Sequence, residues 1–143
     1  MEKFDEQLEK RVWERIHGEG QVRSLQSLAV SERGNAAAYL RLTRMTQGAQ
    51  KNLLRRLYER ERQHEQCLSG MSRMMEGKNL SVRTLPPAAD DLTTALRKCY
   101  TASLQAAAEY DRRSPDGEYG CVFRRLAREE KENCAMILEI LGS

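Results

Sequence analysis

Glutamate and histidine stand three residues apart, as Glu61 and His64, in the middle of a long helical pattern. Side chains at positions i and i+3 of an α-helix are neighbours on its surface. A carboxylate oxygen and an imidazole nitrogen presented side by side are suitable ligands for iron, manganese or zinc. A similar stretch returns in the second half of the chain, where Glu130 matches Glu61 and Asn133 matches His64. The chain therefore looks like a duplicated helical hairpin in which one half has lost its histidine.

The expected helices place these residues, together with an earlier glutamate, on inward faces. Glu32 falls on the apolar stripe of one helix, and Glu61, His64 and Glu130 fall on the stripes of two others. A carboxylate on an inward face costs several kcal/mol unless it is paired or coordinated. Two interpretations stay open. Either these four side chains share one divalent metal ion, which we favour, or they form a buried network of hydrogen bonds and arginine ion pairs.

Amphipathic helices are expected to carry these residues. Apolar residues recur at helical spacing over five segments: 1–18, 21–46, 51–76, 92–110 and 122–141. The first is short and ends at glycines, and the turn signal Ser114-Pro115-Asp116-Gly117 separates the last two. We therefore predict an N-terminal amphipathic arm of residues 1–18 and a four-helix bundle of residues 19–143.

The connection between the second and third long helices indicates the topology of the bundle. Residues 77–89, which include Pro86 and Pro87, are the only long stretch without a helical pattern. A helix of about 26 residues is roughly 40 Å long, and about 13 extended residues can span a similar distance. An up-down-up-down bundle would need only a short loop here. We therefore predict an all-α protein with a long crossover between helices two and three.

With these features the sequence resembles the rubrerythrin-like branch of the ferritin-like di-iron proteins, over about residues 21–142. Glu61 and His64 resemble the Glu-x-x-His motif of that family, and Glu32 resembles its helix-one glutamate. Glu130 to Asn133 is the same motif with asparagine in place of histidine. The resemblance implies a ferritin-like four-helix bundle with a carboxylate-bound iron centre that reduces hydrogen peroxide.

The resemblance also implies that the second half of the centre is impaired. When Tyr110 is aligned with Tyr39, Ser103 stands opposite Glu32, where the family has glutamate. Glu109 is the nearest acid, but it lies about 120° away around the helix and becomes a ligand only if that helix shifts. We therefore expect metal ligands at Glu32, Glu61, His64 and Glu130 alone.

This ligand set is expected to hold one ion or none: iron, or another divalent metal such as manganese or zinc. A single ferrous ion supplies one of the two electrons that peroxide reduction requires, so the implied oxidoreductase activity is expected to be reduced or lost. The catalytic residues and the electron donor stay unknown. The competing function is that of a metal-free ferritin-like scaffold that acts through protein partners. Its interaction surface would be the arm, which docks on its own bundle or on a second copy to give a homodimer.

The remaining charged and sulfur side chains have ordinary interpretations. Glu59, Glu65, Glu129 and Glu132 each have arginine or lysine three or four positions away, which is typical of a solvated helix surface. The four cysteines show no Cys-x-x-Cys spacing, so they are expected to be reduced thiols.

Composition excludes two further classes of partner. The net charge is +3, with basic and acidic residues interleaved, so no nucleic-acid partner is expected. No apolar run approaches the roughly 18 residues of a membrane span, and the N-terminus lacks the apolar segment of a signal peptide. We therefore expect a soluble, cytoplasmic protein without a membrane partner.

Overall fold

The computed structural model describes residues 23–83, 85–115 and 117–142. These residues form four α-helices and no strand: α2 (Leu25–Thr43), α3 (Gly48–Glu76), α4 (Leu92–Arg113) and α5 (Gly120–Gly142). The predicted all-α class is confirmed for this part of the chain. The predicted arm of residues 1–18 and the domain boundary after it lie outside the described residues.

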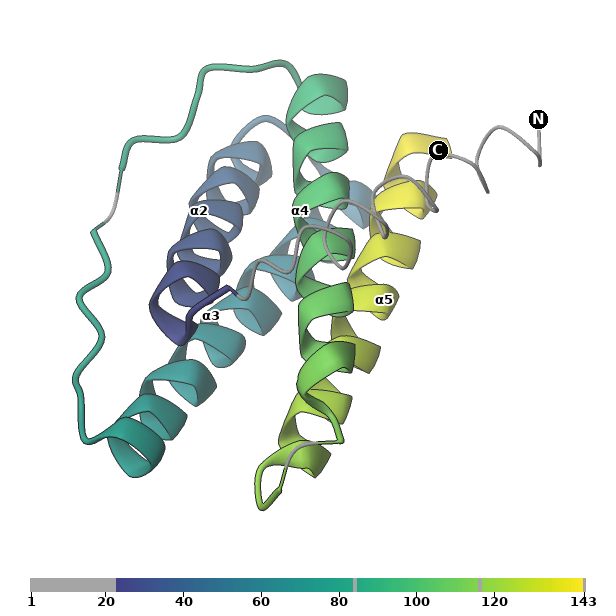
Figure 1. Ribbon diagram of the computed structural model, residues 1–143. Helices are drawn as coiled ribbons and strands as arrows, with labels where there is room; N and C mark the ends of the chain where they lie inside the picture. The colour runs from purple at the N-terminus through teal and green to yellow at the C-terminus, as the bar shows by residue number, and fades with distance from the viewer. Residues whose placement is uncertain (1–22, 84, 116, 143) are drawn as a thin grey trace.

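The four helices form two antiparallel hairpins that pack against each other (Figure 1). One hairpin consists of α2 and α3, and the other consists of α4 and α5. Across the bundle, α2 contacts α4 and α3 contacts α5. Helices α2 and α5 are therefore diagonal to each other, as are α3 and α4, and each hairpin presents both of its helices to the other.

The connection from α3 to α4 runs along the outside of α2 (Figure 1). Near the start of α2, the Ser81 backbone N–H donates to Gln26 Oε1 over 3.0 Å. Farther along, Arg33 Nη1 donates to the Val82 carbonyl over 2.7 Å, and near the end Arg41 Nη2 donates to the Asp90 carbonyl. The linker thus runs along the whole of α2. A crossover of this kind is what the length of residues 77–89 predicts.

Local capping determines where the helices begin and end. Ser24 accepts a hydrogen bond from the Ser27 N–H and starts α2, so this helix begins later than its apolar pattern suggests. Asp91 caps α4 in the same way through the Thr94 N–H. Helix α3 ends at Gly77, whose φ of 65° lies in the left-handed region that glycine adopts without strain.

The apolar core is divided into two clusters. At one end Leu28, Leu68, Tyr110 and Phe123 pack together, and at the other end Tyr39, Leu57, Leu96 and Ile137 do so. In every helix, the residues between the two clusters include buried polar side chains. These are Glu32, Glu61, His64, Ser103, Glu130 and Asn133. A polar layer therefore separates the two halves of the core.

Two residues on the predicted apolar stripes face outward instead. Leu40 is 38% exposed and Met75 is 45% exposed, because each lies at the edge of its stripe and the helix on which it stands turns that edge to solvent. In the described residues, no helix has the length and apolar character needed to cross a membrane.

Candidate metal centre

The four predicted ligands meet in the polar layer. Glu32 comes from α2, Glu61 and His64 from α3, and Glu130 from α5. All four residues are buried, with whole-residue exposures of 0–1%. Each contributes one oxygen or nitrogen atom to a group whose members all lie within 4.8 Å of one another. Helix α4 contributes none, so three helices supply every member of the cluster.

Hydrogen bonds from neighbouring side chains fix two of the carboxylates. The Tyr110 hydroxyl donates to Glu32 Oε1 over 2.9 Å. Asn133 Nδ2 donates to Glu61 Oε1 over 2.6 Å. In each case one carboxylate oxygen is bound and the other is left to face the cluster, so Tyr110 and Asn133 set the orientation of the groups that could hold an ion.

The imidazole of His64 lies against the other two carboxylates. Its Nδ1 atom is 2.9 Å from Glu130 Oε1 and 3.4 Å from Glu32 Oε2. These distances bring positive and negative charge together only when the ring is protonated. In the absence of a cation, a protonated His64 is therefore the counter-charge of the cluster.

Three carboxylate oxygens in this cluster are buried without a hydrogen bond from any described residue. They are Glu32 Oε2, Glu61 Oε2 and Glu130 Oε2, one on each contributing helix. A buried polar atom without a partner costs about 1–3 kcal/mol, more when it is charged. His64 Nδ1 is 3.4 Å from Glu32 Oε2, but its hydrogen bond is with Glu130 Oε1. The three oxygens together therefore form a favourable environment for a cation.

A divalent cation fits this arrangement. Metal–oxygen and metal–nitrogen bonds of about 2.0–2.2 Å place the ligand atoms of one ion at most about 4.4 Å apart. The donor atoms here lie within 4.8 Å of one another, so a contraction of a few tenths of an ångström brings them into range. Carboxylate and imidazole together suit iron, manganese and zinc.

Burial and mutual repulsion change the proton affinities of the cluster. Burial, followed by the negative charges of Glu130 and Glu32, raises the pKa of Glu61 well above its ordinary value. Burial and the charge of Glu32 raise the pKa of Glu130 to about 7, although His64 opposes this change. Three carboxyl groups this close cannot all be ionised unless more positive charge is present.

The pKa values of His64 and Glu32, the other two members of the cluster, shift in the directions that favour their charged forms. Burial acts to lower the pKa of His64, but the adjacent Glu130 and Glu32 carboxylates raise it to about 10. Burial acts to raise the pKa of Glu32, but hydrogen bonds from Glu61 and His64 lower it overall. Without metal, the cluster thus holds an imidazolium facing an ionised Glu32.

The positions of the polar layer that match Glu32 and His64 in the internal repeat carry no charge. Ser103 and Asn133 are fully buried there, as the sequence alignment predicts. Tyr39 lies beside Ser103, but its buried hydroxyl has no hydrogen-bond partner of ordinary geometry among the described residues. In the matching place of the other half, the Tyr110 hydroxyl binds Glu32. The two tyrosines thus differ in their neighbours: Tyr110 has a carboxylate acceptor and Tyr39 has a serine.

Two glutamates predicted on the solvated surface lie elsewhere. Glu65 is buried and its Oε1 is 2.6 Å from Arg33 Nη2 on α2. Glu129 is half-buried, and its Oε1 is 2.9 Å from His64 Nε2. The prediction considered basic residues on the same helix, whereas the actual partners come from neighbouring helices. The only available signal was that each residue directly follows or precedes a residue of the cluster.

Glu109 takes no part in the cluster, in agreement with the position predicted from the helical turn. Its carboxylate oxygen Oε1 lies 2.7 Å from Arg112 Nη2 and 3.1 Å from Arg113 Nε. Burial acts to raise the pKa of Glu109, but these two guanidinium groups lower it overall. This carboxylate is therefore already neutralised by its own helix.

The cysteines are free thiols, as predicted. Cys99 is buried close to Tyr39, and burial raises the pKa of its thiol to about 11. A cavity between α2, α4 and the linker, lined in part by Arg41, Pro87 and Lys98, reaches Cys99 from the surface. Cys99 is therefore a neutral thiol between this cavity and the unpartnered Tyr39 hydroxyl.

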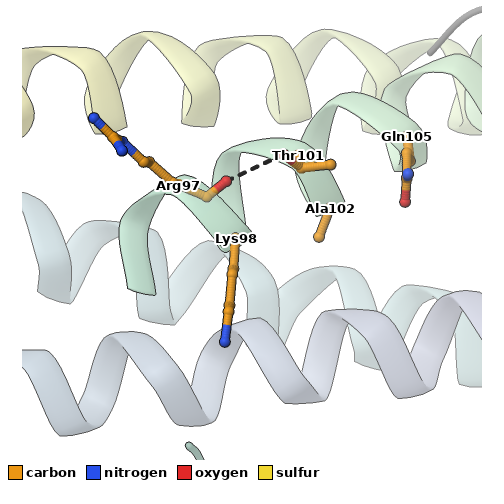
Figure 2. A pocket seen from close by; sticks show the side chains of 5 residues that line it. All are labelled: Arg97, Lys98, Thr101, Ala102 and Gln105. Atoms are coloured by element: carbon orange, nitrogen blue, oxygen red, sulfur yellow. Dashed lines mark hydrogen bonds between the residues drawn. The ribbon is translucent and has the colours of Figure 1, made fainter. Parts of the chain in front are cut away.

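A second hollow lies on the outer surface of α4 (Figure 2). Arg97 and Lys98 extend from it in opposite directions, and the Thr101 hydroxyl donates to the Arg97 carbonyl over 3.2 Å. None of its lining residues belongs to the cluster. The chemistry of the described residues therefore concentrates in the buried polar layer rather than in this hollow.

The centre has to be interpreted from its own geometry. Comparisons of the chain with known protein families, with curated proteins and with solved structures found no match.

Proposed function

We propose that this protein binds a single divalent metal ion through Glu32, Glu61, His64 and Glu130. The observation that carries the proposal is the convergence of three buried carboxylate oxygens that accept no hydrogen bond of ordinary geometry from a described residue. The hydrogen bonds of the cluster do not reach these atoms, whereas one cation would be in contact with all three. Metal binding requires His64 to give up a proton, and the entering ion then takes over the positive charge that the imidazolium provides.

The proposed stoichiometry is one ion because the opposite half of the layer is neutral. A second cation would need its own anionic or imidazole ligands. Ser103 and Asn133, which occupy the matching positions, carry no charge, and Asn133 already donates its amide to Glu61. The negative charge of three carboxylates is enough to offset one divalent ion and no more.

For the chemistry of the ion, we propose an iron-dependent role in peroxide or oxygen defence, in line with the resemblance of the motif to rubrerythrin-like proteins. Bound ferrous iron would supply one of the two electrons that peroxide reduction requires, and an external electron donor would supply the other. The chain's own residues would hold and orient the iron: Tyr110 positions Glu32, and Asn133 positions Glu61. Oxidisable side chains next to this layer include Tyr39, Cys99 and Tyr110.

The alternative function is a metal-free ferritin-like scaffold that acts through partners. One observation favours it: a protonated His64 already gives Glu130 and Glu32 an ionic partner. In that case the polar layer has only a structural role, which is to fix the positions of the helices relative to one another. The two proposals differ in whether the purified chain takes up metal.

Metal content separates the two proposals. The full chain, purified without chelator and loaded anaerobically with ferrous iron, manganese or zinc, should retain about one equivalent after desalting. The Glu61→Ala, His64→Ala double variant should retain less than a tenth of that amount. A matched Glu59→Ala, Gln63→Ala variant changes two exposed residues of the same helix and should bind as the wild type does. Absence of uptake by the folded wild-type protein would leave the scaffold as the better proposal.

A further inference from the structure

The two ring nitrogens of His64 face different carboxylates. Nδ1 points into the cluster, 2.9 Å from Glu130 Oε1. Nε2 points the other way, towards the edge of the bundle, where Glu129 Oε1 lies at 2.9 Å. The His64 side chain is 2% exposed and that of Glu129 is 22% exposed. One buried ring is therefore held between an inner carboxylate and an outer one, both from α5.

Only one imidazole nitrogen can bind a metal ion, and the other then carries the proton. A hydrogen-bond acceptor on the protonated nitrogen fixes the tautomer and the orientation of the ring, and a carboxylate acceptor also makes the ligand more basic. We infer that Glu129 is a positioning residue of the centre, which holds the proton on Nε2 and so leaves Nδ1 to bind the ion. This inference rests on the proposed metal site.

The internal repeat gives independent support. In the alignment of the two halves, Glu129 matches Arg60, as His64 matches Asn133. The half that has the histidine thus has a carboxylate facing it from the opposite helix. The half that has lost the histidine has an arginine in the corresponding place, and arginine cannot accept a hydrogen bond.

The present partner of Arg60 agrees with this difference. Its Nη1 atom is 2.8 Å from Glu132 Oε2, in an ion pair on the surface between α3 and α5. Glu132 is 49% exposed, so this contact is an ordinary surface pair. The outer carboxylate therefore occurs only where there is an imidazole for it to orient.

The experiment uses the full chain loaded with zinc, a diamagnetic probe, and labelled with ¹⁵N at histidine. The chain has two histidines, and a His17→Gln background leaves only the signals of His64. In the wild type, the ¹⁵N spectrum should show zinc on Nδ1 and a slowly exchanging proton on Nε2. Glu129→Ala should weaken zinc binding by about 10–100-fold and make the Nε2 proton exchange rapidly.

Two further variants separate positioning from a structural effect. Glu129→Gln keeps a carbonyl acceptor but loses the charge, so it should retain the Nε2 proton and lose less affinity than Glu129→Ala. Glu132→Ala removes an exposed carboxylate from the same helix and should leave both measurements unchanged. A merely structural role for Glu129 would destabilise the metal-free fold without changing the nitrogen signals or selectively weakening zinc binding.

The outcomes distinguish this inference from the proposal on which it rests. If the folded wild-type chain binds neither zinc nor another divalent ion, the metal site and the role of Glu129 fall together. If the wild type binds zinc but Glu129→Ala binds it equally well, or if Nε2 is the ligated nitrogen, only the role of Glu129 is overturned.

Discussion

Two tyrosines in matching places of the two halves have different hydrogen-bond surroundings. Tyr110 donates to Glu32 over 2.9 Å. The hydroxyl of Tyr39, its counterpart, lies beside Ser103 and makes no hydrogen bond of ordinary geometry with a described residue. The donor is therefore present in both halves, but the carboxylate acceptor is present in only one. At the scale of single residues, the asymmetry of the centre comes down to Ser103 and Asn133.

Supplying ligands at those two positions should create a second site. The Ser103→Glu, Asn133→His double variant supplies a carboxylate for Tyr39 and an imidazole in the matching motif, so the number of bound ferrous or zinc ions should rise from about one to about two. Equilibrium dialysis followed by elemental analysis measures this stoichiometry. Ser103→Ala is the control, because it changes the same position without adding a ligand. A folded double variant that still binds one ion would show that the missing ligands are not the cause of the asymmetry.

At the scale of the elements, close approach of the chain to itself determines how α4 is joined to α5. Gly120 is the first residue of α5, and a Cβ atom there would overlap the carbonyl oxygen of Ser114 at the end of α4. Because α5 carries Glu130, the turn that precedes α5 helps to determine where the Glu130 carboxylate lies in the cluster. A glycine far from the chemistry thus contributes to the geometry of the centre.

Alanine substitutions at two helical glycines should have opposite effects. Gly120→Ala is expected to lower the free energy of unfolding by about 1–3 kcal/mol, because the turn backbone must move away from the new methyl group. Gly70 lies within α3 with nothing within 4 Å of a Cβ atom, so Gly70→Ala should raise the free energy of unfolding by about 0.5–1 kcal/mol. Urea denaturation followed by circular dichroism measures both. Equal effects at the two glycines would contradict the close approach at Gly120.

At the scale of the whole molecule, the polar layer links the stability of the bundle to protons. The pKa of Glu130 rises from 4.5 to about 7 on folding, and that of His64 rises from 6.5 to about 10. The folded chain therefore holds protons that the unfolded chain has released. Under this condition the free energy of unfolding decreases as the pH rises. Glu61 acts in the same direction, because its pKa is also raised.

The metal-free protein should accordingly lose stability as the pH rises from about 5 to about 9. The contribution of Glu130 to the free energy of unfolding should be lost mainly below pH 7. This loss should be on the order of 2 kcal/mol. Glu32 acts in the opposite direction, but its lowered pKa confines that effect to more acidic solutions. Urea denaturation in the presence of chelator, at several pH values and constant ionic strength, measures the slope. Glu130→Gln should make the slope shallower below pH 7, and a stability that rises over this range would contradict the assignment.

Much of the arrangement could be predicted from the sequence because it depends on periodicity along one helix. The inward positions of Glu32, Glu61, His64 and Glu130 follow from apolar spacing alone, as does the burial of Ser103. The contact between Glu129 and His64 could not be predicted, because it depends on how α5 is rotated against α3. The exposure of Leu40 has the same origin: the edge of a stripe is buried or exposed according to the neighbouring helix. The start of α2 was misplaced because a single capping serine outweighs the apolar pattern.

The cluster draws unequally on the two hairpins. Glu32, Glu61 and His64 belong to the first, whereas Glu130 alone belongs to the second. An ion bound by all four would therefore act as a cross-link between the hairpins, in addition to the long linker, the apolar packing and polar contacts such as the Arg60–Glu132 ion pair. Removal of the ion would chiefly weaken the association of one hairpin with the other. Each hairpin would keep its own turn and internal contacts.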